Sequence, residues 1–145
     1  MSLKTLSLAI AGIASLAITN TALAQKKYDP GASDKEIVIG AIHPYSGPAS
    51  AYGAIGKAIG SYIEMVNADG GINGRKIKFI PLDDGYNPAK TVEQARRLVE
   101  QDEALIVFNP LGTPPNTAIH KYMNDRKVPH LFVATGATKW GDPKN

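Results

Sequence analysis

The sequence predicts a doubly wound α/β fold, with helices on both faces of a parallel sheet. Short apolar runs that are typical of strands buried on both faces alternate with segments whose apolar residues recur at helical spacing. These segments follow one another in the order βαβαβαβ, and right-handed crossovers between such strands make the sheet parallel. About 120 residues follow the N-terminal apolar segment, enough for one domain with a modest core.

The predicted strands are four runs of mainly apolar residues. The first, Glu36-Ile37-Val38-Ile39-Gly40-Ala41-Ile42, is nearly continuous, as expected of a central strand in a parallel sheet. The four strands are expected at residues 36–42, 76–82, 104–108 and 128–134.

The first predicted helix begins at Ser50, whose hydroxyl is expected to cap a first-turn amide. The helix should run to Asp69, where Gly70 or Gly71 supplies the left-handed residue that ends it. Its apolar residues form one stripe that should face the sheet. They are Ile55, Ile59, Tyr62, Ile63 and Val66.

Two further helices are predicted between the later strands. One spans residues 88–101, and the other begins with Thr113 as N-cap and Pro114 at the first helical position. The inward-facing residues of these two helices are Val92, Ala95, Val99, Ile119, Tyr122 and Met123.

Residues 1–24 have the three parts of a secretory signal peptide. These are an early Lys4, an apolar run over residues 6–18, and the small-residue end Ala22-Leu23-Ala24. The run is too short for a comfortable membrane span. The sequence has no cysteine, which excludes disulfides, thiolate metal sites and a lipid-modified cysteine after the signal. We therefore expect a polar leader at residues 25–35, a lobe at residues 36–145, and a soluble protein in the periplasm.

Ligands of doubly wound sheets bind beyond the carboxyl ends of the strands, where loops lead into helix N-termini. The loops that qualify here span residues 43–52, 83–88, 109–116 and 134–140. They contain hydroxyls, glycines and four aromatic residues, but Lys139 is their only basic side chain apart from histidine. A phosphate-rich ligand therefore fits poorly. A single carboxylate fits better, because amides and hydroxyls can hold it while aromatic rings contact the apolar part of the ligand.

Other function classes find little support. Asp83 and Asp84 are interpreted as structural, because carboxylates at strand ends commonly accept hydrogen bonds from loop amides. The histidines, His43, His120 and His130, lack metal-ligand spacing. There is no nucleophile elbow, phosphate loop or dinucleotide fingerprint, and the net charge of +3 is spread without blocks. We expect no enzymatic activity, cofactor, metal or nucleic-acid partner.

Four motifs occur together in this chain. They are Ser46-Gly47-Pro48 through Tyr52-Gly53, the turn Gly70-Gly71-Ile72-Asn73-Gly74-Arg75-Lys76, the pair Asp83-Asp84, and Ala134-Thr135-Gly136-Ala137-Thr138. In order and spacing they resemble the leucine/isoleucine/valine-binding-protein family of periplasmic solute receptors. The resemblance implies a protein that captures a small carboxylate-bearing solute and delivers it to an ABC permease in the inner membrane. In this family a second lobe closes over the ligand by a hinge, and this chain is expected to carry most of the first lobe only.

The resemblance also implies which residues contact the ligand. These are Tyr52 in the first loop, Gly112 and Thr113 in the third, and Gly136, Ala137 and Thr138 in the fourth. Further candidates for the cleft wall are Tyr45, Ser46, Tyr86 and Trp140. Thr113 stands where amino-acid binders usually have serine, which leaves two ligand classes open, branched-chain amino acids and aromatic acids or amides. The alternative function is the ligand-sensing domain of a signalling receptor with the same fold.

Overall fold

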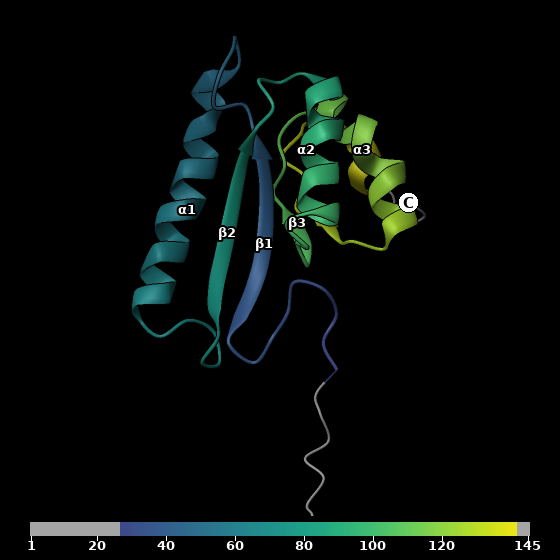
Figure 1. Ribbon diagram of the computed structural model, residues 1–145. Helices are drawn as coiled ribbons and strands as arrows, with labels where there is room; N and C mark the ends of the chain where they lie inside the picture. Colours follow the sequence, from purple (N-terminus) through teal and green to yellow (C-terminus); the bar gives the residue numbers. More distant parts are fainter. Residues whose placement is uncertain (1–26, 142–145) are drawn as a thin grey trace, which may run out of the picture.

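A computed structural model describes residues 27–141 of the chain (Figure 1). Four parallel strands form one sheet in the order β2-β1-β3-β4. Their bounds are Glu36–His43 for β1, Lys76–Asp83 for β2, Ile106–Phe108 for β3 and His130–Leu131 for β4. The predicted doubly wound parallel sheet is confirmed. The predicted signal peptide lies outside the described residues.

Helices pack on both faces of the sheet. The helix α1 (Gly53–Ala68) follows a short 3-10 turn, η1 (Ser50–Tyr52), and packs on β1 and β2. The helices α2 (Pro88–Glu100) and α3 (Thr113–Arg126) lie side by side on the opposite face (Figure 1). Gly40 of β1 lets α2 approach closely, since a Cβ there would lie 2.7 Å from Leu98. A last 3-10 turn, η2 (Thr138–Gly141), follows β4.

The hydrophobic core lies between the sheet and the α2–α3 face. Val38 and Ile42 of β1 meet Ala95 and Leu98 of α2 there, and Ile119 and Met123 of α3 are also fully buried. Val92, Val99 and Tyr122 pack at the border of this cluster. The inward faces predicted for the second and third helices are therefore confirmed.

Both predicted N-caps are wrong. Ser50 is the first residue of η1, and no side chain caps η1 or α1. Thr113 lies inside α3, whose N-cap is Gly112, and its hydroxyl bonds across to Thr135 instead. In α2 a side chain does cap the helix, since Asn87 Oδ1 accepts hydrogen bonds from the amides of Ala89 and Lys90. For Thr113, a hydroxyl of the fourth loop thus replaces a helix amide as the partner.

The third and fourth strands are shorter than predicted. Ala104 donates its N–H to Leu98 O at the end of α2, so it does not join the ladder. Phe132 has a φ of 56°, in the left-handed region, and this turn of the backbone ends β4 after two residues. Parallel pairing resumes only as an isolated bridge between Leu111 and Ala134.

The predicted inward stripe of the first helix is partly wrong. Ile63 is buried, while Ile59 and Val66 are half-buried. Ile55 is 37% exposed and Tyr62 is 63% exposed. Among the described elements α1 packs mainly on β1 and β2, and Tyr62 borders a hollow between the helix and Phe108 of β3. The helix ends as predicted, with Gly70 and Gly71 both at positive φ. Within residues 27–141, no helix is long and apolar enough to span a membrane.

Candidate functional site

The loops that follow the four strands meet at the carboxyl edge of the sheet and surround a cavity of about 650 Å³. Its lining is apolar, aromatic or hydroxyl-bearing, and none of the described residues contributes a charged side chain to it. The lining residues are Pro48, Ala49, Tyr52, Ile55, Tyr86, Leu111, Gly112, Thr113, Ala134, Thr135 and Gly136.

Two tyrosines form the walls of this cavity. Tyr52 ends η1 and is 60% exposed, whereas Tyr86 lies in the turn after β2 with a φ of 63°. The ring of Tyr86 rests against Gly112, where a Cβ would lie 2.5 Å from Tyr86 Cε2. Gly112 itself has a φ of 103°. Glycine at this position therefore serves both the backbone turn and the placement of the tyrosine.

The Thr113 and Thr135 hydroxyls join the third and fourth loops beside the cavity through a direct hydrogen bond. Thr135 Oγ1 also accepts a hydrogen bond from the amide of Ala137 at 3.2 Å. Each hydroxyl carries one hydrogen, and the bond between them uses only one of the two. The other hydrogen remains free to donate to a ligand oxygen.

The N-terminus of α3 offers fewer amide donors than a typical helix start. Pro114 and Pro115 have no N–H, and the N–H of Asn116 donates to Gly112 O. The N–H of Gly112 is also engaged, with Ala134 O at 3.0 Å. The donors left for an anion here are the N–H of Thr113, the threonine hydroxyls and amides of the fourth loop.

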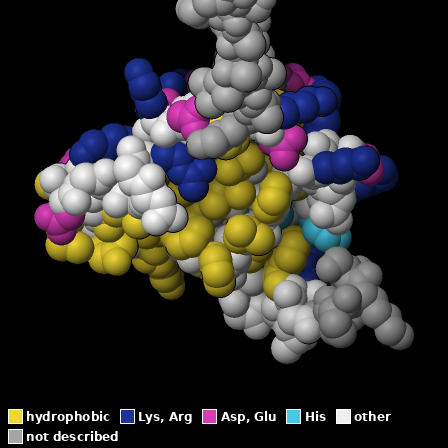
Figure 2. Space-filling view, turned by 90° about the horizontal axis from the view of Figure 1, so that it is seen from below, with side chains coloured by type: hydrophobic (Ala, Val, Ile, Leu, Met, Phe, Trp, Pro, Cys, Tyr) yellow, Lys and Arg dark blue, Asp and Glu magenta, His cyan; other side chains and the backbone are white. Residues whose placement is uncertain are grey.

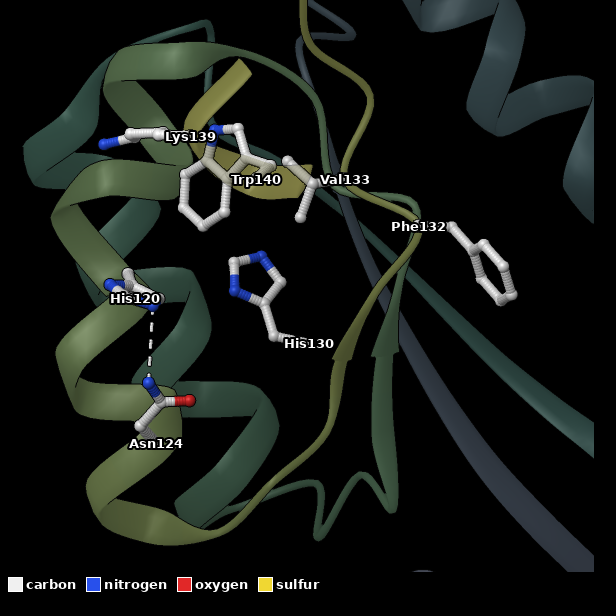
Figure 3. A pocket seen from close by; sticks show the side chains of 7 residues that line it. All are labelled: His120, Asn124, His130, Phe132, Val133, Lys139 and Trp140. Atoms are coloured by element: carbon white, nitrogen blue, oxygen red, sulfur yellow. Dashed lines mark hydrogen bonds between the residues drawn. The ribbon is translucent and has the colours of Figure 1, made fainter. Parts of the chain in front are cut away.

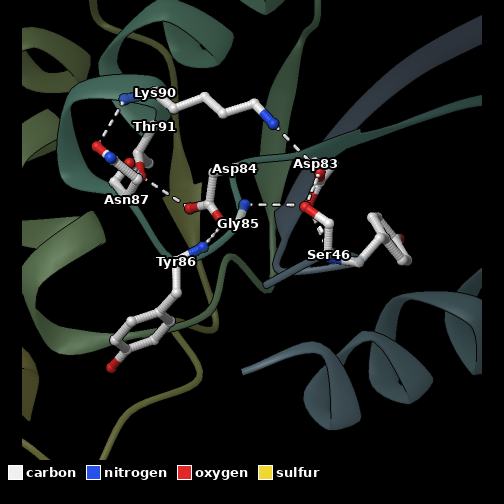
Figure 4. A network of polar contacts seen from close by, with 9 residues as sticks. Ser46, Asp83, Asp84, Gly85, Tyr86, Asn87, Lys90 and Thr91 are labelled. Atoms are coloured by element: carbon white, nitrogen blue, oxygen red, sulfur yellow. Dashed lines mark hydrogen bonds and ion pairs between the residues drawn. The ribbon is translucent and has the colours of Figure 1, made fainter. Parts of the chain in front are cut away.

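Asp83 fixes the first loop to the second (Figure 4). Its Oδ1 accepts hydrogen bonds from the amides of Tyr45, Ser46 and Gly85, and its Oδ2 accepts the Ser46 hydroxyl at 2.5 Å and Lys90 Nζ at 3.1 Å. Desolvation alone would raise the pKa of Asp83, but these hydrogen bonds outweigh it and hold that pKa far below its usual range. The predicted structural role of Asp83 agrees with this geometry.

Asp84 organises the second loop. It is fully buried, and its carboxylate accepts hydrogen bonds from the Tyr86 amide at 2.8 Å and from the Thr91 hydroxyl at 2.7 Å. These bonds tie the turn that carries Tyr86 to the first turn of α2 (Figure 4). The two neighbouring aspartates thus position Ser46 and Tyr86 respectively.

Three of the four predicted wall residues, Tyr45, Ser46 and Trp140, lie outside the lining of this cavity, so their predicted place is wrong. The Ser46 side chain is directed to Asp83. Tyr45 packs beneath α1, with its ring against Gly56 and near His43. Burial lowers the pKa of His43, which therefore lies neutral beneath the first loop.

Trp140 lines a second cavity, of about 560 Å³, between α3 and the fourth loop (Figure 3). Its ring makes edge contacts with the rings of His120 and His130, with 5.3 Å and 5.8 Å between the ring centroids. His130 Nε2 lies 2.7 Å from Asn116 Oδ1, while the Asn116 amide nitrogen donates to Pro110 O and Gly112 O. Asn116 Oδ1 must then be an acceptor, so His130 donates from Nε2. This chain of bonds holds the third loop in place.

The structure brings five of the ten candidate residues together around the first cavity. These are Tyr52, Tyr86, Gly112, Thr113 and Gly136. Ala137 and Thr138 follow in the same loop but do not line it. The candidate residues did not include the other lining residues, Pro48, Ala49, Ile55, Leu111, Ala134 and Thr135. Thr135 stood in a loop already identified, so its hydroxyl could have been included, whereas apolar residues give no signal of their own.

Among the described residues, no three histidine, aspartate or glutamate side chains gather in a way that could hold a metal ion.

An α/β lobe with a neutral, partly aromatic cavity at the carboxyl edge of its parallel sheet belongs to the class of small-molecule-binding lobes. The family model for periplasmic binding proteins matches residues 36–145, and the chain belongs to this family. The predicted resemblance to leucine/isoleucine/valine-binding proteins is likewise confirmed.

Individual relatives agree. An amino acid binding protein from Pseudomonas aeruginosa is 40% identical over 73 residues, which cover 50% of this chain and 20% of the relative. A crystal structure of a possible leucine/isoleucine/valine-binding protein from Rhodopirellula baltica SH 1 superposes with a TM-score of 0.68 at 29% identity, covering 72% of this chain and 29% of that one. The structure of a fatty acid ABC transporter substrate-binding protein from Thermomonospora curvata gives a TM-score of 0.62 at 31% identity, covering 70% of this chain and 26% of that one. The chain therefore spans less than a third of the length of these relatives.

Proposed function

We propose that this chain is part of a periplasmic substrate-binding protein of an ABC transporter, which captures a small carboxylate-bearing solute for import. The observation that carries the proposal is the neutral cavity at the carboxyl edge, whose lining combines the Thr113–Thr135 hydroxyl pair with Tyr52 and Tyr86. Family membership and a relative described as an ABC transporter substrate-binding protein support it.

The chemistry of the cavity suits a carboxylate with an apolar or aromatic body. The one free hydrogen of the threonine pair donates to a carboxylate oxygen, and the tyrosine rings cover the apolar part. We propose no reaction for this protein, since the cavity lining formed by residues 27–141 holds no acidic, lysine or histidine side chain to act as a base. In the complete receptor a second lobe would close over the solute, and an inner-membrane permease would receive it.

A thermal-shift screen of the receptor that contains this segment tests the proposal. The probes are leucine, isoleucine, benzoate and benzamide, which represent the two ligand classes. Binding of one of the acids should raise the melting temperature in proportion to the logarithm of its concentration, by mass action. A receptor that responds to none of the acids, or that turns one of them over, would contradict the proposal.

A further inference from the structure

The turn from Gly70 to Lys76 carries part of the family resemblance, yet none of its residues lines the proposed solute cavity. It joins the end of α1 to the start of β2, which is an edge strand of the described sheet (Figure 1). Glycine keeps the turn tight, since a Cβ at Gly71 would collide with Arg75 O. The turn thereby brings Asn67, in the last turn of α1, beside Ile77 of β2.

The Asn67 side chain binds both backbone polar groups of Ile77. Its Nδ2 donates to Ile77 O at 2.8 Å, and the Ile77 N–H donates to Asn67 Oδ1 at 2.8 Å. A residue of a neighbouring antiparallel strand would exchange the same two bonds with Ile77. The amide therefore occupies the position that a residue of an added strand would take.

The backbone groups of β2 alternate between its two sides. The N–H groups of Lys76 and Asp84 donate to carbonyl groups at the two ends of β1, at 2.8 and 3.3 Å. Even-numbered residues of β2 therefore face β1, and the odd-numbered residues turn their N–H and C=O outward. The bonds between Asn67 and Ile77 agree with this alternation.

Little of this outer edge remains free for pairing. Asn67 occupies the polar groups of Ile77, and Pro81 has no N–H to donate. Asp83 ends the strand, with its carboxylate bound to the first loop. Phe79 is the outward residue between Ile77 and Pro81, and its N–H and C=O have no hydrogen-bond partner among the described residues. An incoming strand would find one free residue where it needs a continuous row.

The same edge is accessible, so that some protection against pairing is needed. A groove of about 640 Å³ lies between α1 and β2, and Ile77, Phe79 and Pro81 contribute to its lining. Within residues 27–141, no strand pairs with the outer side of β2. A row of unpaired N–H and C=O groups on such an edge is a template for pairing with another chain.

We propose that Asn67 caps the edge of β2 and, together with Pro81, keeps this strand from pairing with the β2 strand of a second copy. A second copy is the relevant partner, because two identical edges can pair antiparallel about a twofold axis. That arrangement needs the bonds that Asn67 already makes to Ile77. The turn after α1 thus serves to place the cap, and β2 remains an edge strand in the complete receptor.

Amide hydrogen exchange of the unaltered receptor tests the state of the edge without any substitution. After correction for intrinsic rates, we expect the Ile77 N–H to exchange at least about tenfold more slowly than the Phe79 N–H, because only the former has a hydrogen-bond partner. In Asn67→Ala the Ile77 rate should rise by at least about tenfold. A Phe79 amide as slow as that of Ile77 would show that another strand pairs with the edge, and would overturn the proposal. An unchanged Ile77 rate in Asn67→Ala would overturn it as well.

Sedimentation velocity of the receptor tests the consequence for self-association. The double variant Asn67→Ala/Pro81→Val frees Ile77 and restores an N–H at position 81. We expect its dimer dissociation constant to be at least about tenfold lower than that of the wild type, since the freed groups can pair across two edges. A double variant that associates no more than the wild type would contradict the proposal.

Ile63→Val is the matched control for lost stability. Ile63 is a buried residue of the same helix, so the variant loses packing but keeps the cap on Ile77. We expect it to associate no more than the wild type. Association as strong as that of the double variant would mean that unfolding, and not the open edge, drives it. Neither measurement involves a solute, so failure of solute binding and failure of this proposal are distinguishable.

Discussion

The Thr113–Thr135 pair supplies a hydroxyl donor for a ligand carboxylate in the proposed site. We expect Thr135→Val, which preserves the shape of the side chain, to weaken solute binding by about 1 to 3 kcal/mol through loss of a hydrogen bond to a charged group. Titration calorimetry of the receptor measures the change in dissociation constant. Thr117→Val is the control, because the Thr117 hydroxyl bonds to Thr113 O at 2.7 Å and lies outside the cavity lining. Equal affinities of the wild type and Thr135→Val would exclude the pair as ligand donors.

Gly112 and Gly136 line the same cavity but differ in what they tolerate. A Cβ at Gly112 would meet the Tyr86 ring in a residue with a φ of 103°, whereas nothing lies within 4 Å of a Cβ at Gly136. We expect Gly112→Ala to lower the free energy of unfolding by about 1 to 3 kcal/mol. Gly136→Ala should change it by less than about 0.5 kcal/mol. Denaturant unfolding of both variants measures these free energies. If both variants lost the same free energy of unfolding, the positive φ and the Tyr86 contact would not require glycine at position 112.

The Asp83 carboxylate joins the loops after β1 and β2. We expect Asp83→Asn to lower the free energy of unfolding by about 1 to 3 kcal/mol, because several donors lose a charged acceptor. The folded protein holds the pKa of Asp83 below the unfolded value of about 3.9, so this contribution is present above that pH and is lost as the pH falls.

Asp125→Asn is the matched control for Asp83. Asp125 makes an exposed i,i+4 ion pair with Lys121, and such pairs contribute about 0.3 to 0.5 kcal/mol. Urea unfolding at pH 7 and pH 3 compares the variants. If Asp83→Asn were no more destabilising than Asp125→Asn at pH 7, the anchoring role of Asp83 would be refuted.

His130 connects β4 to α3 and makes stability depend on pH. Burial, with a smaller contribution from nearby His120, lowers the pKa of His130 from 6.5 to about 4. Between these values the unfolded chain binds a proton that the folded chain does not, so the free energy of unfolding falls as the pH drops from about 6.5 to 4. Burial of His43 acts in the same direction.

The variant His130→Gln keeps an amide donor for Asn116 and removes the titrating ring. We expect it to reduce the slope of the free energy of unfolding between pH 7 and pH 5, with the slope due to His43 remaining. Denaturant unfolding at several pH values measures this slope. An unchanged slope would mean that His130 is accessible to protons in the folded state.

The sequence predicted the order and type of the elements because apolar periodicity reports local structure directly. It misjudged Ile55 and Tyr62, because periodicity shows that a helix has an apolar side but not how far the partner surface extends. It overextended the fourth strand, since nothing in the composition around Phe132 indicates a positive φ. The rule for parallel sheets located the cavity correctly. It could not show that the Tyr45 ring packs against Gly56, or that the Ser46 hydroxyl bonds to Asp83, which places both side chains outside the cavity.

At the scale of the whole molecule, the described residues provide one wall of the proposed binding site. The cavity lies at the carboxyl edge of the sheet. Seen from the opposite end of the sheet, hydrophobic side chains gather in one continuous area of the surface (Figure 2). In the proposed receptor a second lobe would close over the cavity, and the affinity for solute would then depend on contacts from both lobes.

The central claim is that the cavity between the four loops binds a solute through its carboxylate. Calorimetric titration of the receptor with the best acid from the screen, and with the methyl ester of that acid, tests this claim most directly. We predict one-to-one binding of the acid and at least about tenfold weaker binding of the ester, since the ester lacks the charge that the hydroxyl donors stabilise. An ester that binds as tightly as the acid would contradict the account.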